Sequence, residues 1–146
     1  MGRAYADETE STPIFWSGNW VTINFYRSAA GFGRNGVTYT YRTWNLHTGQ
    51  EVDIWRWLGG KSGEEGKSQL PVRLKHALFK GVKLADGCSD GYREEGYYRL
   101  QLKPDGIDLF EEEYGDGCGE RFFIKYKKLA KFLTPEGKAA LKDELK

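Results

Sequence analysis

The chain has 146 residues, and its 22 basic and 21 acidic side chains leave a net charge of +1. This length favours one domain with a sizeable core, and the balanced charge provides no strong field for attracting nucleic acid or anionic lipid. We therefore expect no nucleic-acid partner. No apolar run approaches the ~18 residues of a membrane span, so we also expect no membrane span. Any export signal or anchor is expected to be absent from this sequence.

The first third of the sequence predicts an arm followed by a pair of strands. Residues 1–17 are mostly polar and predict a flexible arm or the end of an upstream segment. Residues 18–146 are expected to form a single domain. Within it, 19–27 and 37–46 alternate apolar and polar side chains, which is typical of strands with one face in a core. We expect the two strands to pair antiparallel across a glycine-rich connection at 28–36.

The middle of the sequence predicts two helices. Asp53 is suited to cap a short helix that ends at Gly59. Residues 68–80 then place Leu70, Leu74 and other apolar side chains on one stripe of a longer helix, whose basic side chains face outward. This longer helix is expected to cover one face of the sheet.

The last third predicts three further strands, at 97–102, 107–113 and 120–126. The first two are joined by Lys-Pro-Asp-Gly at 103–106, because proline presets φ and glycine supplies a positive φ in such turns. Thr134 is suited to cap a C-terminal helix that starts with a proline. Together these elements predict an α+β fold: an antiparallel sheet of about five strands, helices packed on one face and one disulfide staple.

The two cysteines predict that staple. Cys88 and Cys118 each lie in a turn rich in glycine and aspartate. A disulfide between them would close a loop of roughly 30 residues and would indicate an oxidising compartment. Two free buried thiols are the alternative, whereas zinc binding is disfavoured because neither His47 nor His76 lies at a ligand spacing. We expect a periplasmic or extracellular protein without a metal.

The sequence offers little for catalysis. Residues 31–36 spell G-x-G-x-x-G, but a dinucleotide fingerprint must open a helix, and the residues that follow alternate like a strand. No G-x-S-x-G elbow accompanies the histidines. Paired carboxylates for a glycosidase would come from an acidic cluster that lacks apolar surroundings. This cluster consists of Glu111, Glu112, Glu113, Asp116 and Glu120. We expect no catalytic residue and no cofactor, with a small glycan- or peptide-processing hydrolase as the alternative.

The tryptophans are the strongest candidates for binding. Trp16, Trp20 and Trp44 lie at or near the polar faces of the first two predicted strands, so some should be exposed as stacking platforms for sugar rings or as anchors for a protein partner. A helix covering that face is the alternative. The glycine-rich connection adds an arginine that can stack on a ring or pair with a carboxylate. The candidate ligand-binding residues are Trp16, Trp20, Phe32, Arg34, Asn35 and Trp44.

Two stretches of the sequence resemble a known family. The first runs from the glycine-rich 31–37 through 41–52 to the tryptophan-rich 55–58, and the second combines 102–107 with IKYKKLAKFLTPEG at 124–137. In content and order they are similar to the domain of unknown function found at the C-terminal end of the lysozyme-sensing anti-sigma factor RsiV and in some cell-wall deacetylases. The resemblance covers residues 18 to about 140.

The resemblance implies an extracytoplasmic, non-catalytic domain, because deacetylase chemistry belongs to a separate domain of those proteins and RsiV binds lysozyme through its extracellular region. It also implies that the two cysteines match a staple of Gram-negative members. The sequence departs from the family at 31–33, where a Gly-Ala-His element is common, and lacks the RsiV transmembrane helix. We expect a binding or sensing module for a cell-wall glycan or a wall-active protein such as lysozyme, with an accessory structural domain as a further alternative.

Overall fold

The structure is a computed structural model, and it describes residues 6–31, 34–84, 86–88, 96–111 and 118–146. The chain forms two compact units, Met1–Val52 and Asp53–Lys146, each with its own antiparallel sheet. The predicted antiparallel pairing is confirmed, but the prediction of one sheet of about five strands is wrong: the strands are divided into a four-stranded and a three-stranded sheet. Each strand pairs with its neighbours in sequence, and a helical segment of the chain separates the two groups.

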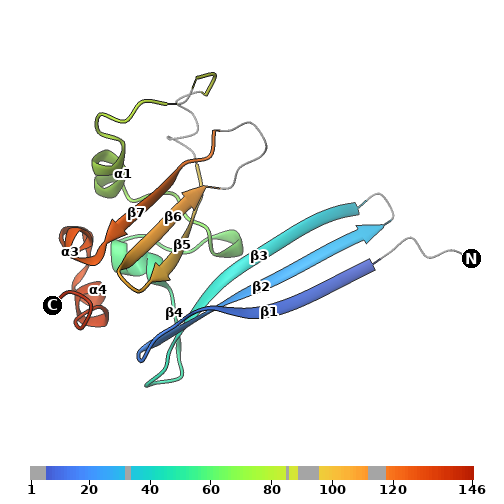
Figure 1. Ribbon diagram of the computed structural model, residues 1–146, viewed down its shortest axis with the longest axis horizontal. Helices are drawn as coiled ribbons and strands as arrows, with labels where there is room; N and C mark the ends of the chain where they lie inside the picture. The colour runs from blue at the N-terminus through green and yellow to red at the C-terminus, as the bar shows by residue number, and fades with distance from the viewer. Residues whose placement is uncertain (1–5, 32–33, 85, 89–95, 112–117) are drawn as a thin grey trace, which may run out of the picture. The chain divides into compact units, whose positions relative to one another are not determined.

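The first unit is a meander of four strands (Figure 1). They are β1 (Ala6–Trp16), β2 (Trp20–Gly31), β3 (Arg34–Asn45) and β4 (Glu51–Val52). β1 lies where the sequence predicted a flexible arm. Its polar residues do not prevent pairing, because an antiparallel edge strand bonds its neighbour through backbone groups while its side chains stay largely in solvent. Residues 6–17 therefore belong to the first unit.

β2 and β3 form the predicted ribbon but are longer than expected. The glycine-rich segment contributes residues 28–31 to β2 and 34–36 to β3, so that Gly31 pairs with Arg34. Glycine and alanine have little strand propensity of their own. The register set by the preceding pairs therefore carries both strands through this segment.

The second unit contains β5 (Tyr98–Lys103), β6 (Gly106–Glu111) and β7 (Arg121–Lys125). The turn predicted between the first two is confirmed, since Lys103 pairs with Gly106, but the positive φ expected of Gly106 is wrong, because this glycine is the first residue of β6 and has an ordinary φ. Glycine is required at position 106 because a Cβ atom there would collide with the carbonyl group of Ile124 on β7. A close backbone approach thus fixes β7 against β6.

Short helices complete the second unit. They are η1 (Ile54–Leu58), η2 (Glu64–Gly66), α1 (Val72–Phe79), α3 (Tyr126–Leu129), η3 (Ala130–Phe132) and α4 (Pro135–Ala140). Both predicted N-caps are confirmed. The Asp53 carboxylate accepts a hydrogen bond from the Trp55 N–H at 3.1 Å, and the Thr134 hydroxyl accepts one from the Gly137 N–H at 3.1 Å.

The helix predicted at 68–80 is shorter in the structure. Ser68 instead bridges to Tyr98 at the edge of β5 through two backbone hydrogen bonds of 3.0 and 2.8 Å. Pro71 follows, and proline disfavours a helical backbone in the residue before it, so the helix does not extend back through Leu70 and α1 begins at Val72. Leu74 is 1 % exposed and is the buried residue of α1, as its place on the predicted stripe requires.

The core of the second unit lies on one face of its sheet. The register places Leu100 opposite Leu109 and Leu102 opposite Ile107, and all four side chains are buried. Helices α1, α3 and α4 lie on one side of this sheet (Figure 1). They contribute further buried residues, with the segments that flank them: Leu74, Tyr126, Leu129, Leu133 and Leu141.

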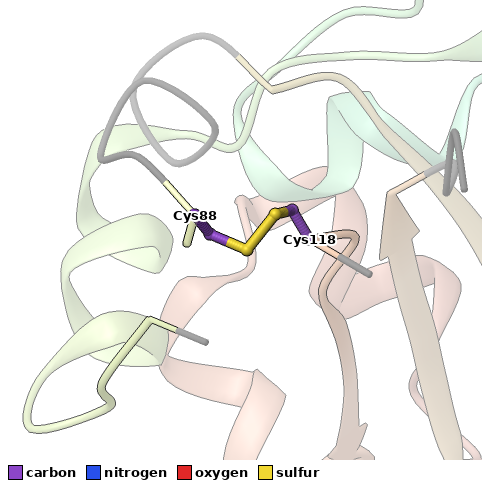
Figure 2. The surroundings of a disulfide bond; sticks show 2 residues. All are labelled: Cys88 and Cys118. Carbon is purple, nitrogen blue, oxygen red and sulfur yellow. A yellow bond between two sulfur atoms is a disulfide. The ribbon is translucent and has the colours of Figure 1, made fainter. Parts of the chain in front are cut away.

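The predicted disulfide between Cys88 and Cys118 is confirmed (Figure 2). The two Cα atoms are 5.6 Å apart, and the cysteines are 30 positions apart in sequence. The bond links the segment that follows α1 to the segment that precedes β7. It closes a loop that contains β5 and β6 and so ties one side of the helical layer to the sheet.

Candidate functional site

The sheet of the first unit has two chemically different faces. Residues opposite each other in an antiparallel pair point to the same face, so the register assigns each side chain. Trp20 shares the first face with Thr22 and Thr43, which lie opposite each other. Val21 and Trp44 also lie opposite each other and belong to the second face.

The second face gathers exposed and half-buried aromatic side chains. We call it the aromatic face and define it by Trp16, Val21, Phe25, Arg42 and Trp44. Its residues come from β1, β2 and β3, which lie side by side in the sheet (Figure 1). The aromatic face is therefore built on paired strands rather than on a loop.

A β-bulge brings Trp16 to this face. The register between β1 and β2 shifts at Ile14, which is the extra residue of β1. One extra residue reverses the alternation of the side chains that follow. Trp16 consequently lies opposite Val21, whereas a regular strand would have placed it opposite Trp20 on the first face.

The guanidinium of Arg42 contacts two rings of the aromatic face. Its Cζ atom lies 5.5 Å from the ring centroid of Phe25 and 5.3 Å from that of Trp44, and the two rings contact each other edge to face at 6.0 Å. The guanidinium donates to both carboxylate oxygens of Glu51, with the Nε–Oε1 pair at 2.8 Å. These hydrogen bonds raise the pKa of Arg42, and burial opposes them only in part. The charge of Arg42 is thus fixed, and the guanidinium keeps both rings in place.

Trp16 is the exposed end of a row across the sheet. Val21 on β2 lies opposite Trp16 on β1 and opposite Trp44 on β3. Adjacent strands are about 4.8 Å apart, so the Cα atoms of the two tryptophans are separated by roughly 10 Å. The side chain of Trp16 is 69 % exposed and that of Trp44 is half-buried. The row presents one open indole next to a second one that is held by Arg42.

Trp20 does not belong to this surface. It lies on the opposite face and is 4 % exposed, so the expectation that it serves as a surface platform is wrong. The alternation within the strand groups Trp20 correctly with Thr22, but it does not show that these side chains are buried. Thr22 and Thr43 on the same face are buried too, and their hydroxyl oxygens are 2.8 Å apart in a hydrogen bond.

The other candidates are only partly covered by the structure. Phe32 lies outside the described residues. Arg34 and Asn35 belong to β3, whose backbone the structure describes at these positions, and their side chains lie outside the description. Of the six candidate residues, the structure therefore brings Trp16 and Trp44 together on one face.

Sequence reasoning missed Phe25 and Arg42. The alternation of residues 19–27 places Phe25 on the face that is expected to lie in the core, and Arg42 shares its predicted face with Trp44 but is not among the candidates. The missing information is the register: because Gly31 pairs with Arg34, the odd positions of β2 share a face with the even positions of β3. The glycines at the end of the hairpin were the available signal, since a two-residue connection fixes this register.

The described residues contain no group of histidine, cysteine or acidic side chains that could hold a metal ion. The ring Nε2 of His47 is 2.8 Å from the Asn19 side-chain oxygen. Of the acidic cluster considered for hydrolase chemistry, Glu111 and Glu120 are described, and the N–H of the former donates to the carbonyl of the latter at 2.9 Å. Glu112, Glu113 and Asp116 lie outside the described residues.

The chain matches no protein-family model, and no curated protein sequence is similar to it. The resemblance to the RsiV domain therefore stays a prediction. Among the described residues, no helix is both long enough and apolar enough to cross a lipid bilayer.

Proposed function

We propose that this protein is a non-enzymatic binding or sensing module of the cell envelope and that the aromatic face is its binding surface. The ligand is a cell-wall glycan or a wall-active protein such as lysozyme. One observation carries the proposal: the exposed Trp16 lies on the same face of the sheet as Trp44, whose ring contacts Arg42.

The chemistry of the face suits a glycan chain. Sugar rings carry apolar C–H faces that stack on indole, and the two tryptophans are spaced by roughly 10 Å, a separation that suits alternate rings, one disaccharide apart, of one chain. The ion pair between Arg42 and Glu51 lies beside them and offers polar atoms to sugar hydroxyls. Tryptophan and arginine are also the residues that most often anchor a protein partner. Both ligand classes use the same residues, and neither requires a reacting group.

An envelope location is supported by the Cys88–Cys118 disulfide, because such bonds persist in oxidising compartments. The periplasm and the extracellular space are both of this kind. The sequence resemblance to the RsiV domain points to the same location and to the same candidate ligands. We therefore propose a periplasmic or extracellular site of action.

Co-sedimentation with purified peptidoglycan sacculi and capture on immobilised lysozyme test the proposal on the full chain. Trp16→Ala should weaken binding to the true ligand at least fivefold, about 1 kcal/mol, because it removes the open indole. Val37→Ala is the matched control. Val37 is 56 % exposed but lies on the opposite face of the same sheet, so its replacement should leave binding unchanged within about twofold.

Two results would contradict the proposal. Equal loss of binding in the Trp16 and Val37 variants would show that the aromatic face is not the binding surface. Release of reducing sugars from the sacculi by the full chain would show that the protein is a hydrolase.

Thermal unfolding of both variants should match that of the parent protein, since both side chains are exposed.

A further inference from the structure

A second surface, in the other unit, has a different chemistry. An open groove of about 400 Å³ runs between η1, the start of α1 and the segment after η3. We call it the α1 groove. Its walls are formed by Leu58, Gly59, Pro71, Val72, Arg73, Leu74, Phe132, Leu133 and Thr134. Val72 is 69 % exposed at its rim.

The side chains that line the α1 groove are mostly apolar, and three of its backbone donors are in use. The N–H of Gly59 donates to Arg56, that of Leu133 to Ala130 and that of Thr134 to the Trp57 carbonyl, at 3.1, 3.2 and 2.8 Å. Pro71 has no N–H. The other wall donors include those at the start of α1, which no side chain caps. The groove therefore suits an apolar side chain with a hydrogen-bond acceptor, such as a carboxylate, next to it.

The charged groups at the groove are cations. Arg73 lines it and donates to the Lys131 carbonyl at 3.4 Å, which uses one of its five N–H donors. Arg73 forms no ion pair with any residue that the structure describes. The Lys131 ammonium lies 5.2 Å from the Phe132 ring. The acid nearest to the wall in sequence, Glu136, is already paired with Arg56 at 3.4 Å.

We infer that the α1 groove binds a peptide segment of a partner protein in which a bulky apolar side chain stands next to an acidic one. The apolar side chain enters between Val72, Leu58 and Phe132. The carboxylate binds the guanidinium fork of Arg73, whose geometry matches it. A volume of 400 Å³ is within the range of ligand sites and accommodates one or two large side chains. This inference concerns the second unit alone and does not rest on the proposed function of the aromatic face.

The test is an NMR titration of the full chain with the peptide N-acetyl-Phe-Leu-Glu-amide. Backbone signals of the groove residues should shift, and those of the first unit should not. Arg73→Gln should weaken binding at least fivefold, because it removes the charge and the fork. Lys80→Gln is the matched control: it removes one exposed positive charge just after α1, away from the groove wall, and should change the affinity less than twofold.

Two further probes distinguish an acidic peptide from a neutral peptide and from an apolar acid that has no peptide backbone. N-acetyl-Phe-Leu-Gln-amide should bind at least fivefold more weakly than the acidic peptide, and octanoate, an apolar acid without a peptide backbone, should bind more weakly than either. The inference is overturned if the acidic peptide causes no shifts in the groove, if its Gln counterpart or octanoate binds equally well, or if the Arg73 and Lys80 variants lose affinity alike.

Discussion

At the scale of single residues, Tyr126 joins the helical end of the second unit to its sheet. Its hydroxyl donates to the carbonyl of Lys103, and its side chain is buried. Burial raises the pKa of Tyr126 well above its usual value, and the charges of Glu144 and Asp105 add to the effect. A raised pKa in the folded state stabilises the fold fully below the unfolded value of about 10, and this contribution is lost as the pH rises beyond it.

Tyr126→Phe should therefore lower the free energy of unfolding by about 1 kcal/mol at pH 8, through loss of the hydrogen bond. The difference between parent and variant should shrink as the pH rises from 9 to 11, because only the parent must keep a tyrosine protonated in its folded state. Urea unfolding at several pH values measures both. A difference that stays constant across this range would contradict the assignment.

Gly137 of α4 packs closely against Trp57 of η1. A Cβ atom at this position would lie 2.7 Å from the Trp57 carbonyl oxygen and 2.8 Å from the Trp57 Cβ. Gly137→Ala should destabilise the protein by about 1 to 3 kcal/mol, because the helix must move away from its neighbour.

Gly18→Ala is the control for this substitution, since a Cβ atom at Gly18 meets nothing within 4 Å. It should shift the urea midpoint only slightly, within about 0.5 kcal/mol. Equal shifts for the two alanine variants would refute the close contact of α4 with η1.

At the scale of elements, a buried pair of threonines locks β2 to β3. Thr22 and Thr43 are 1 % and 3 % exposed, and their hydroxyls bond each other. Thr22→Val should cost about 1 to 3 kcal/mol because it leaves the Thr43 hydroxyl buried without this partner. The double variant with Thr43→Val should recover most of the loss, since neither strand then buries an unmet hydroxyl. A double-mutant cycle measured by urea unfolding checks this, and purely additive losses would contradict it.

Most elements could be predicted from the sequence because their signals are local. Asp53 and Thr134 cap their helices as predicted, and the Pro-Asp-Gly turn joins β5 to β6. The failures occur where tertiary pairing overrides local pattern. β1 is a strand because β2 offers it a partner along its whole length, and Ser68 leaves the predicted helix because it bridges to Tyr98.

The candidate site could be predicted only in part for the same reason. Trp16 and Trp44 were chosen because they lie at or near the polar faces of the predicted strands, Trp16 in the predicted arm, but the face that each occupies depends on the bulge at Ile14 and on the register of the hairpin. A shift of one residue at either place reverses a face. Alternation within a single strand carries no information about such shifts, which is why Phe25 and Arg42 were missed.

At the scale of the whole molecule, the disulfide contributes to stability through the loop that it closes. Cys88 and Cys118 are 30 residues apart, and a loop of this size corresponds to a stabilisation of about 3 to 4 kcal/mol on the chain-entropy model. Reduction with dithiothreitol should lower the urea midpoint accordingly. The variant with both cysteines replaced by serine should already have this lower midpoint and should not respond to the reductant. An unchanged midpoint of the parent protein after complete reduction would contradict this role.

The central claim is that the aromatic face binds the ligand, and the five tryptophans of the chain allow a direct test. Each indole N–H gives its own signal in a ¹⁵N-resolved NMR spectrum, so the buried Trp20, Trp55 and Trp57 serve as internal controls for the exposed Trp16. The full chain is titrated with soluble peptidoglycan fragments and, separately, with lysozyme. We expect one titrant to shift the Trp16 signal, with a smaller shift of Trp44, while the three buried indoles stay in place. If neither titrant moves the Trp16 signal, or if the buried indoles respond and Trp16 does not, the aromatic face is not the binding surface.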